Sequence, residues 1–438
     1  MSEQITLTGL TYGPNAIGRM ANGKAVFVEQ GVPGDVVEVN VIRDGASFCE
    51  GTITDMVQAS PQRVPPACPH AGVCGGCSWM HVDYEAQLEA KRANIVSQLM
   101  RIAHLPAEEA ESLVESCRAS KRQLGYRNKL ELAVGADAAG RFQLGFHEAH
   151  SDKLVTPKTC PIAAKGIQKA PAALQGALRY LQGTRDLGIF RIGIRHSLRT
   201  KSTEVALWTA PGPFPRKMVA QTIASALPCS SIVRVMADPG KARKIKGVEA
   251  LNGRGCWEES LCGTSFKVSA PSFFQVNTAQ AEYLVEEVLD ALELEEDSVA
   301  ADLYCGVGTF SLPLAKRIDT VFAVESAASS VRDLRRNAEA NGIPLDIIGG
   351  DSARELPLLG HLDALIVDPP RAGLAKGVAE SIAEAAPHRL AYISCDPATW
   401  ARDVVRLRHV GYEPLRVKPV DLFPHTYHVE TVSIFEKK

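Results

Sequence analysis

The stretch Asp302-Leu303-Tyr304-Cys305-Gly306-Val307-Gly308-Thr309 forms a glycine-containing loop directly after the apolar segment Val299–Leu303. Glycines at a strand-to-helix turn let the backbone approach a ligand closely. Glu325 follows about twenty residues later, where an acid at a strand end can hydrogen-bond ribose hydroxyls. No third glycine stands in the dinucleotide spacing, which disfavours NAD. Although a glycine loop alone is often only a tight turn, the loop and the acid together predict a nucleoside-type cofactor.

Strands and helices alternate around this loop, from Pro271 to the C-terminus. Such alternation predicts an open, mostly parallel α/β sheet. Helical stretches separate the first five strand candidates. The candidates are the apolar segments Val299–Leu303, Val321–Val324, Leu345–Ile348, Ala364–Val367, Leu390–Ile393, Leu415–Val420 and Thr431–Phe435.

Two more strand ends are expected at the same crevice, because ligands collect at the carboxyl ends of the strands in an open parallel sheet. Asp368 follows the fourth strand candidate and begins a loop stiffened by two prolines. Cys395 ends the fifth strand candidate. A cysteine is usually a small buried hydrophobe. Its place beside Tyr304, Glu325 and Asp368 makes Cys395 a candidate for chemistry instead.

The chain before Pro271 divides into two predicted parts. Residues 1–60 hold short apolar runs separated by glycine-rich turns, which predicts a small OB-like β-barrel. Residues 61–270 are mixed α+β, with a helix expected from Asp83 to Ala103. The expected fold is therefore multi-domain α/β, with a barrel (1–60), a central domain (61–270) and a Rossmann-like domain (271–438).

Eleven cysteines are an odd number, and a disulfide framework is not expected in a reducing compartment. Cys68, Cys74 and Cys77 have the close spacing of metal ligands, and Cys160-Pro161 follows far downstream. Zinc and an iron–sulfur cluster both accept four thiolates, so the spacing does not choose between them. The proline after the last cysteine favours iron–sulfur.

Nothing in the 438 residues predicts export or membrane insertion. The sequence has no uncharged apolar run of roughly eighteen residues or more, as a membrane span requires. The N-terminal residues 1–6 contain no basic region followed by an apolar stretch. We therefore expect a protein of the cytosol.

Charge is unevenly distributed, although the formal net charge is only −2. Residues 185–249 contain twelve basic and four acidic side chains, whereas residues 282–297 contain eight acidic and no basic ones. The first stretch suits a polyanion, although two ordinary solvated faces would look the same. One face of the predicted strand Arg191–Leu198 is expected to form a basic stripe. That face carries Arg191, Arg195 and Arg199.

Several motifs stand in the order found in a known family. They are Tyr126-Arg127-Asn128, Phe273-Phe274-Gln275-Val276-Asn277, the glycine loop, Asp368-Pro369-Pro370-Arg371-Ala372-Gly373, Ser394-Cys395-Asp396-Pro397 and His428-Val429-Glu430-Thr431-Val432. The chain resembles, over nearly its whole length, the RNA uracil-5-methyltransferases. Within them it is similar to the type with an N-terminal TRAM domain and a [4Fe–4S] cluster that acts on bacterial 23S ribosomal RNA.

The resemblance implies roles for the matching residues. The expected contacts to S-adenosylmethionine are Gln275, Tyr304, Glu325 and Asp368, with Asp351 as a further contributor. Cys395 is the expected nucleophile and Glu430 the expected base, although Glu430 alone would be taken for a solvated strand residue. The expected cluster ligands are Cys68, Cys74, Cys77 and Cys160. Thr309 departs from the asparagine of some members, and Arg371 stands where similar cytosine-5 enzymes place a cysteine.

The implied chemistry needs these residue types. Addition of a thiolate to carbon 6 of uracil creates an enolate whose carbon 5 can take a methyl group, and a base then removes the carbon 5 proton. The target uracil must leave its stack in the RNA to react. The rest of the chain is expected to bind structured RNA through its phosphates and its shape. Two alternatives stay open: the same reaction on the T-loop uracil of transfer RNA, and a non-catalytic iron–sulfur RNA-binding protein.

Overall fold

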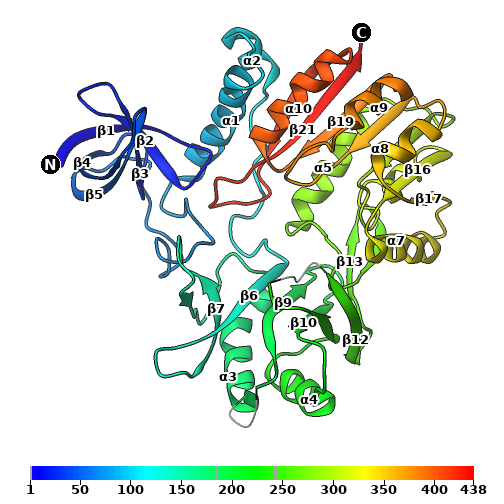
Figure 1. Cartoon of the computed structure of the whole chain (residues 1–438), viewed down its shortest axis with the longest axis horizontal. Coiled ribbons are helices and arrows are strands. Elements are labelled where there is room, and N and C mark those ends of the chain that lie inside the picture. Colours follow the sequence, from blue (N-terminus) through cyan, green and yellow to red (C-terminus); the bar gives the residue numbers. More distant parts are fainter. Residues whose placement is uncertain (1, 183–185, 241–243) are drawn as a thin grey trace.

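The computed structural model describes residues 2–182, 186–240 and 244–438. In these ranges the strands form a closed barrel, two seven-stranded sheets and a two-stranded sheet. Figure 1 shows the barrel at the N-terminal end, one large sheet at the bottom and the other at the upper right, beside the C-terminus. Of the predicted basic stretch, Arg185, Lys241 and Arg243 lie outside the described residues.

The N-terminal strands close into a barrel in the order β1-β2-β3-β5-β4, which confirms the predicted small barrel. Alternate residues point inward, so that Ile5, Val26 and Val39 fill the core while their neighbours face outward. Trp79, which follows the barrel in sequence, is fully buried in the same core. The strands are β1 (Ser2–Leu10), β2 (Asn15–Arg19), β3 (Ala25–Glu29), β4 (Val36–Asp44) and β5 (Phe48–Gln58).

The central sheet has the order β12-β11-β10-β9-β6-β7-β8, and one face is covered by two helices that pack on each other. Ile192 and Ile194 of β9 point into the core beneath these helices. The elements are β6 (Lys129–Ala136), β7 (Phe142–His147), β8 (Leu154–Val155), the short helix η1 (Lys165–Ile167), α3 (Ala170–Gln182), β9 (Ile189–His196), β10 (Thr203–Thr209), α4 (Arg216–Ala226), β11 (Ser231–Ala237) and β12 (Ile245–Gly253).

The C-terminal sheet has the order β17-β16-β15-β18-β19-β21-β20. The first five of these strands run parallel, and β21 is antiparallel to both β19 and β20, as expected for a mostly parallel α/β sheet. The strands are β15 (Val299–Leu303), β16 (Thr320–Glu325), β17 (Asp346–Gly349), β18 (Ala364–Val367), β19 (Arg389–Ser394), β20 (Tyr412–Val420) and β21 (Glu430–Lys437).

Helices and a hairpin cover both faces of the C-terminal sheet. One side holds the hairpin β13 (Trp257–Leu261) and β14 (Thr264–Val268) with α5 (Thr278–Ala291) and α7 (Ala328–Asn341). The other elements of this region are α6 (Ser311–Leu314), α8 (Ser352–Glu355), η2 (Leu356–Leu358), α9 (Val378–Ala385) and α10 (Pro397–His409). None of the described helices combines the length and the apolar character that crossing a membrane requires.

The helix expected over residues 83–103 is α1 (Tyr84–Arg101), followed by α2 (Ala107–Leu113). Asp83 caps α1 by accepting a hydrogen bond from the Glu85 N–H. Ile95 and Leu99 of α1 lie in the apolar core of the C-terminal sheet, and α1 packs against α10. Segments from the predicted central range 61–270 therefore pack on the C-terminal sheet. The domain boundaries themselves stay a prediction.

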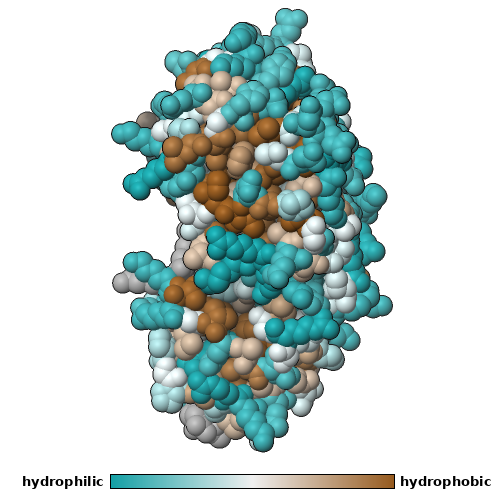
Figure 2. Space-filling model, turned by 90° about the vertical axis from the view of Figure 1, so that its right-hand side faces the viewer, coloured by the Kyte–Doolittle hydropathy of each residue, from teal (hydrophilic) through white to brown (hydrophobic). Residues whose placement is uncertain are grey.

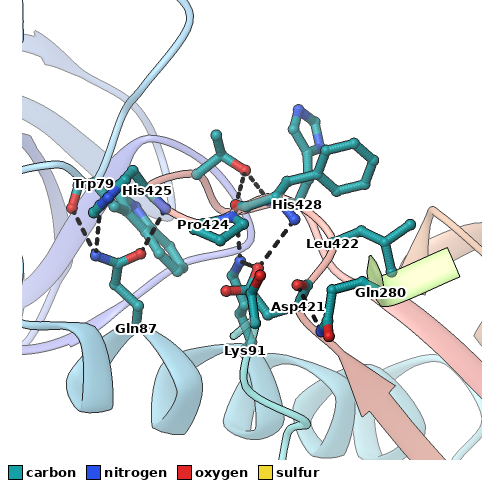
Figure 3. A network of polar contacts seen from close by, with 12 residues as sticks. Trp79, Gln87, Lys91, Gln280, Asp421, Leu422, Pro424, His425 and His428 are labelled. Atoms are coloured by element: carbon teal, nitrogen blue, oxygen red, sulfur yellow. Dashed lines mark hydrogen bonds and ion pairs between the residues drawn. The ribbon is translucent and has the colours of Figure 1, made fainter. Parts of the chain in front are cut away.

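A buried polar network joins α1 to the loop between β20 and β21 (Figure 3). The Nζ of Lys91 lies 2.5 Å from Oδ1 of Asp421, and neither side chain is exposed. Lys91 also donates to the carbonyl of Phe423, and the Tyr84 hydroxyl donates to Oδ2 of Asp421. A buried charge is tolerated when it is paired and hydrogen-bonded in this way.

Gln87, one turn earlier on α1, binds both sides of the same junction (Figure 3). Its side-chain amide donates to the carbonyls of Trp79 and Val82, and its side-chain oxygen accepts from the N–H of His425. The N–H of Trp79 in turn donates to the carbonyl of His425. The segment before α1 and the loop before β21 are thus held together by one helix.

The outline of the molecule in Figure 2 is indented at mid-height on its left edge, between the half that holds the C-terminal sheet and the half that holds the central sheet. Apolar side chains gather in the upper half of this face, and hydrophilic ones form a band across its middle. The indentation therefore lies where the two sheets meet.

Lys91→Met is expected to lower the free energy of unfolding by about 3–5 kcal/mol, because it leaves the Asp421 carboxylate buried without its cation. Lys24→Met is the matched control, since its partner Asp44 is mostly exposed and an exposed ion pair contributes little to stability. Urea denaturation of the three proteins measures both effects. Equal losses for the two variants would show that the buried network does not stabilise the fold.

Candidate active site

The glycine loop after β15 is tied to the end of β16. Tyr304, Gly306 and Gly308 have φ angles of 61°, 60° and 95°, in the region that favours glycine. A Cβ on Gly308 would lie 2.5 Å from Cδ1 of Leu334. The N–H of Gly306 donates to Oε2 of Glu325 over 2.9 Å. The structure thus brings together the loop and the strand-end acid that the sequence singled out.

Further acids surround this loop. Asp302 is fully buried, its Oδ2 accepts from the Ser311 hydroxyl, and its Oδ1 has no hydrogen-bond partner within the described ranges. Burial raises the pKa of Asp302 to about 7, and the nearby Asp368 and Glu325 add to this rise. Burial likewise raises the pKa of Asp368 to about 7. A cation held among these groups would favour their ionised forms.

The other two residues expected at the cofactor lie on neighbouring segments. Asp351 follows β17 and lies close enough to Tyr304 for its charge to raise the pKa of the Tyr304 hydroxyl, although burial is the larger cause. Gln275 is buried, and its carbonyl accepts from the side-chain amide of Asn128 over 2.9 Å. No hydrogen bond between described residues joins the Gln275 side chain to the other predicted cofactor contacts.

Cys395 and Glu430 are brought together by the antiparallel pairing of β19 with β21. Ser394 pairs with Thr431 at the end of this ladder. Cys395 follows Ser394 and Glu430 precedes Thr431, and the two groups lie close enough for the charge of Glu430 to raise the pKa of Cys395. Glu430 is only 3% exposed, and the solvated position that its sequence suggests in isolation is therefore wrong.

Both members of this pair favour their protonated forms in the folded chain. Burial raises the pKa of Cys395 to about 12, and the nearby Glu430 adds to the rise. Burial also raises the pKa of Glu430 well above its usual range, with a further contribution from Asp368. The guanidinium of Arg371 acts in the opposite direction on both groups. The sequence marked Arg371 only as a sign of uracil specificity, whereas the structure places it beside the catalytic candidates.

Two residues near Cys395 were missed by sequence reasoning. The hydroxyl of Tyr12, in the barrel, donates to the carbonyl of Cys395 over 3.3 Å across a sequence separation of 383 residues. His428 lies 3.5 Å from Arg371, between Nδ1 and Nη2, and burial lowers the pKa of His428 to about 4. His428 stands in a recognisable motif, but no local signal in the sequence marks Tyr12.

The four candidate metal ligands line one cavity of about 340 Å³. Arg371 and His428 line the same cavity, which therefore reaches from the cysteines to the surroundings of Cys395. In the part of the chain that the structure describes, no three His, Cys, Asp or Glu side chains converge as ligands of a single metal ion. The cysteines gathered here are Cys68, Cys74, Cys77 and Cys160.

The predicted basic stripe is wrong. Arg195 is only 3% exposed and donates to the carbonyls of Ser269 and Ser272. Arg191 lies over the ring of Trp208, and Arg199 forms an ion pair with Glu282 of α5. The alternation along β9 is as expected, but neighbouring chain segments cover Arg195 and partly cover Arg191 and Arg199, so the three do not form a solvated basic stripe.

Fold and site together define the class of S-adenosylmethionine-dependent methyltransferases. The sequence profile of the tRNA (uracil-5-)-methyltransferase family matches residues 262–357 and 360–438, and the TRAM domain profile matches residues 3–54. The chain belongs to this family of RNA methyltransferases, and it is an S-adenosylmethionine-dependent RNA (uracil-5-)-methyltransferase.

Relatives match along almost the whole chain. An uncharacterized RNA methyltransferase of Gloeobacter violaceus is 35% identical over 99% of this chain and 96% of its own length. One from Thermosynechococcus vestitus is 34% identical over 98% and 97%. The crystal structure of Pyrococcus abyssi tRNA (uracil-54, C5)-methyltransferase in complex with S-adenosyl-L-homocysteine is similar with a TM-score of 0.76, at 26% identity over 98% of this chain and 99% of that one.

Arg195→Lys is expected to raise the KM for S-adenosylmethionine roughly tenfold. A single ammonium does not reproduce the fork of the guanidinium, whose two nitrogens bind the carbonyls of Ser269 and Ser272 and so hold the segment before Gln275. Initial rates of methyl transfer measure this change. The salt dependence of RNA binding is expected to stay as in the wild type. Lys217→Met, at an exposed position of α4, is the control and should change neither quantity. A reduced salt slope with an unchanged KM would restore the RNA-binding role of Arg195.

Proposed function

We propose that this enzyme methylates carbon 5 of a uridine in 23S ribosomal RNA through a covalent adduct between Cys395 and carbon 6 of the uracil, with Glu430 as the base. The observation that carries this proposal is the nearness of Cys395 and Glu430 at the end of the β19–β21 ladder, where the charge of Glu430 acts on Cys395. A nucleophile and a base that lie close together can act on adjacent atoms of a single ring.

The first step belongs to Cys395. Its sulfur adds as a thiolate to carbon 6, and the electron pair of the carbon 5–carbon 6 double bond moves towards the carbonyl at carbon 4 to give an enolate. Burial raises the pKa of Cys395 to about 12, so the thiol must release its proton to water as the target uracil binds. The guanidinium of Arg371 is the nearby cation that favours the thiolate.

S-Adenosylmethionine supplies a methyl group on a cationic sulfonium, and carbon 5 of the enolate takes up this group. Glu430 then removes the proton that carbon 5 still carries, the double bond re-forms, and the Cys395 thiolate leaves. A carboxylate whose pKa is raised by burial is a stronger base than an exposed one. Glu430 suits this step once it is ionised.

The acids at the ends of β15, β16 and β18 suit the cofactor. The charges of Asp368 and Glu325 add to the raised pKa of Asp302, and a sulfonium would bring a positive charge that stabilises the ionised form of Asp302. Glu325 already accepts the N–H of Gly306, so its carboxylate is oriented at the loop where a ribose would bind.

We also propose that Cys68, Cys74, Cys77 and Cys160 hold a [4Fe–4S] cluster. Burial raises the pKa of Cys77 to about 12 and that of Cys160 to about 11, so a metal would be needed to keep them as thiolates. The N–H groups of Ile162 and Ala163 donate to the sulfur of Cys160 and favour its charged form. The cluster would link residues 68–77 to residue 160 and take no part in methyl transfer.

The second candidate substrate is the T-loop uridine of transfer RNA. The likeness to the Pyrococcus abyssi tRNA (uracil-54, C5)-methyltransferase favours it. Labelled S-adenosylmethionine and total RNA from cells that lack the protein distinguish the two targets. Label in 23S ribosomal RNA supports the first proposal, whereas label only in transfer RNA selects the second.

Target RNA with 5-fluorouridine at the methylation site is expected to trap the wild-type protein, because Glu430 cannot remove fluorine as it removes a proton. Denaturing gels and mass spectrometry detect the adduct and its attachment site. Cys395→Ala should neither trap nor methylate, yet should still bind S-adenosylmethionine. Glu430→Gln should accumulate the methylated adduct on ordinary RNA and turn over roughly 10²- to 10⁴-fold more slowly. An adduct on Cys305, or methyl transfer by Cys395→Ala, would contradict the mechanism.

The protein purified without oxygen is expected to be brown and to carry about four iron atoms per chain. Cys160→Ser should lose this iron and bind RNA more weakly, while its affinity for S-adenosylmethionine stays the same because the cysteines lie apart from the glycine loop. Cys229→Ser, which changes a partly exposed cysteine outside the cavity, is the control and should keep the iron. One zinc per chain and no iron would overturn the cluster assignment.

A further inference from the structure

The barrel contributes a side chain to the active site. Tyr12 lies in the tight turn between β1 and β2, where the N–H of Thr11 donates to the carbonyl of Asn15 and the N–H of Gly13 donates to that of Thr11. Although Tyr12 belongs to the barrel, its side chain packs against the apolar core of the C-terminal sheet. The turn therefore projects the ring out of the barrel and into the methyltransferase part of the chain.

A second tyrosine makes the reciprocal contact. Tyr427, in the loop before Glu430, packs against the apolar core of the barrel. The rings of Tyr12 and Tyr427 meet edge to face, with centroids 5.6 Å apart and planes at 87°. This is a favourable aromatic geometry. The two rings thus hold the barrel and the loop before β21 in position relative to each other. Tyr427 stands one residue before His428 and three before Glu430.

The Tyr12 hydroxyl ends at the peptide that carries the nucleophile. It donates to the carbonyl of Cys395 over 3.3 Å, and Oδ2 of Asp396 lies 3.5 Å away. The other oxygen of Asp396 accepts the N–H groups of Ala398 and Thr399 and so caps α10. One end of the Cys395–Asp396 pair is thereby held by α10 and the other by the barrel.

We propose that Tyr12 is a positioning residue, which fixes the backbone of Cys395 so that its sulfur points at carbon 6 of the bound uracil. The inference rests on the proposed role of Cys395. Tyr12 is part of the barrel and contacts the backbone of Cys395. A displacement of the barrel by bound RNA would therefore also displace the nucleophile. The TRAM barrel is then part of the catalytic geometry as well as a surface for RNA.

Tyr12→Phe is the test, since it removes the hydroxyl and keeps the ring contact with Tyr427. We expect kcat to fall roughly three- to tenfold while KM for RNA and for S-adenosylmethionine stays unchanged, because one hydrogen bond that orients the nucleophile is lost. The single-turnover rate of adduct formation with 5-fluorouridine RNA should fall by the same factor. Tyr180→Phe, at an exposed tyrosine of α3, should change none of these quantities.

A purely structural role would lower the melting temperature of Tyr12→Phe and leave kcat of the folded enzyme as in the wild type, and this result would overturn the inference. A rise in KM for RNA at constant kcat would make Tyr12 an RNA contact and would also overturn it. Tyr12→Leu, which removes the ring contact as well, should lower both kcat and the melting temperature. Activity retained by Cys395→Ala refutes the proposed function itself, whatever Tyr12→Phe does.

Discussion

The antiparallel pairing of β19 with β21 is the constraint on which the candidate active site depends. Parallel strands bring only their carboxyl ends to the cofactor crevice, and Cys395 lies at such an end. Glu430 begins β21, the antiparallel neighbour of β19, and it therefore lies near the end of β19, where its charge raises the pKa of Cys395. Because side chains alternate between the faces of a sheet, a slip of one residue would turn the side chain of Glu430 to the other face.

The register of β21 depends in turn on the loop before it, and remote parts of the chain hold that loop. Gln87 and Lys91 of α1 bind the loop from one side through buried hydrogen bonds and an ion pair (Figure 3). Tyr12 of the barrel meets Tyr427 of the loop from the other side. The N-terminal parts of the chain therefore support the segment that leads to Glu430, and do not simply flank the candidate active site.

Buried ionisable groups in this protein are of two kinds: cations with hydrogen-bond partners, and acids whose pKa values are raised. Arg195 and Lys91 are buried cations whose donors are taken by carbonyls and a carboxylate, and they hold segments of the chain in place. At the active site Asp302 has an oxygen without a described partner, and the pKa values of Asp302, Asp368 and Glu430 are raised by burial. Buried acids with raised pKa values are frequent at sites that bind a cation or transfer a proton.

Local patterns in the sequence were enough to predict several strands of the C-terminal sheet and the position of the glycine loop. The strands Val299–Leu303 and Ala364–Val367 stand where alternation and apolar runs predicted them, and the glycine loop lies at the predicted strand end. Tertiary structure alone decided what covers each face and which distant residues meet. The same alternation that set Arg195 on one side of β9 is compatible with solvent or with a covering segment, because periodicity records a face but not its neighbour. For the same reason no local pattern could bring Tyr12 to Cys395, since that contact exists only once the barrel packs against the C-terminal sheet.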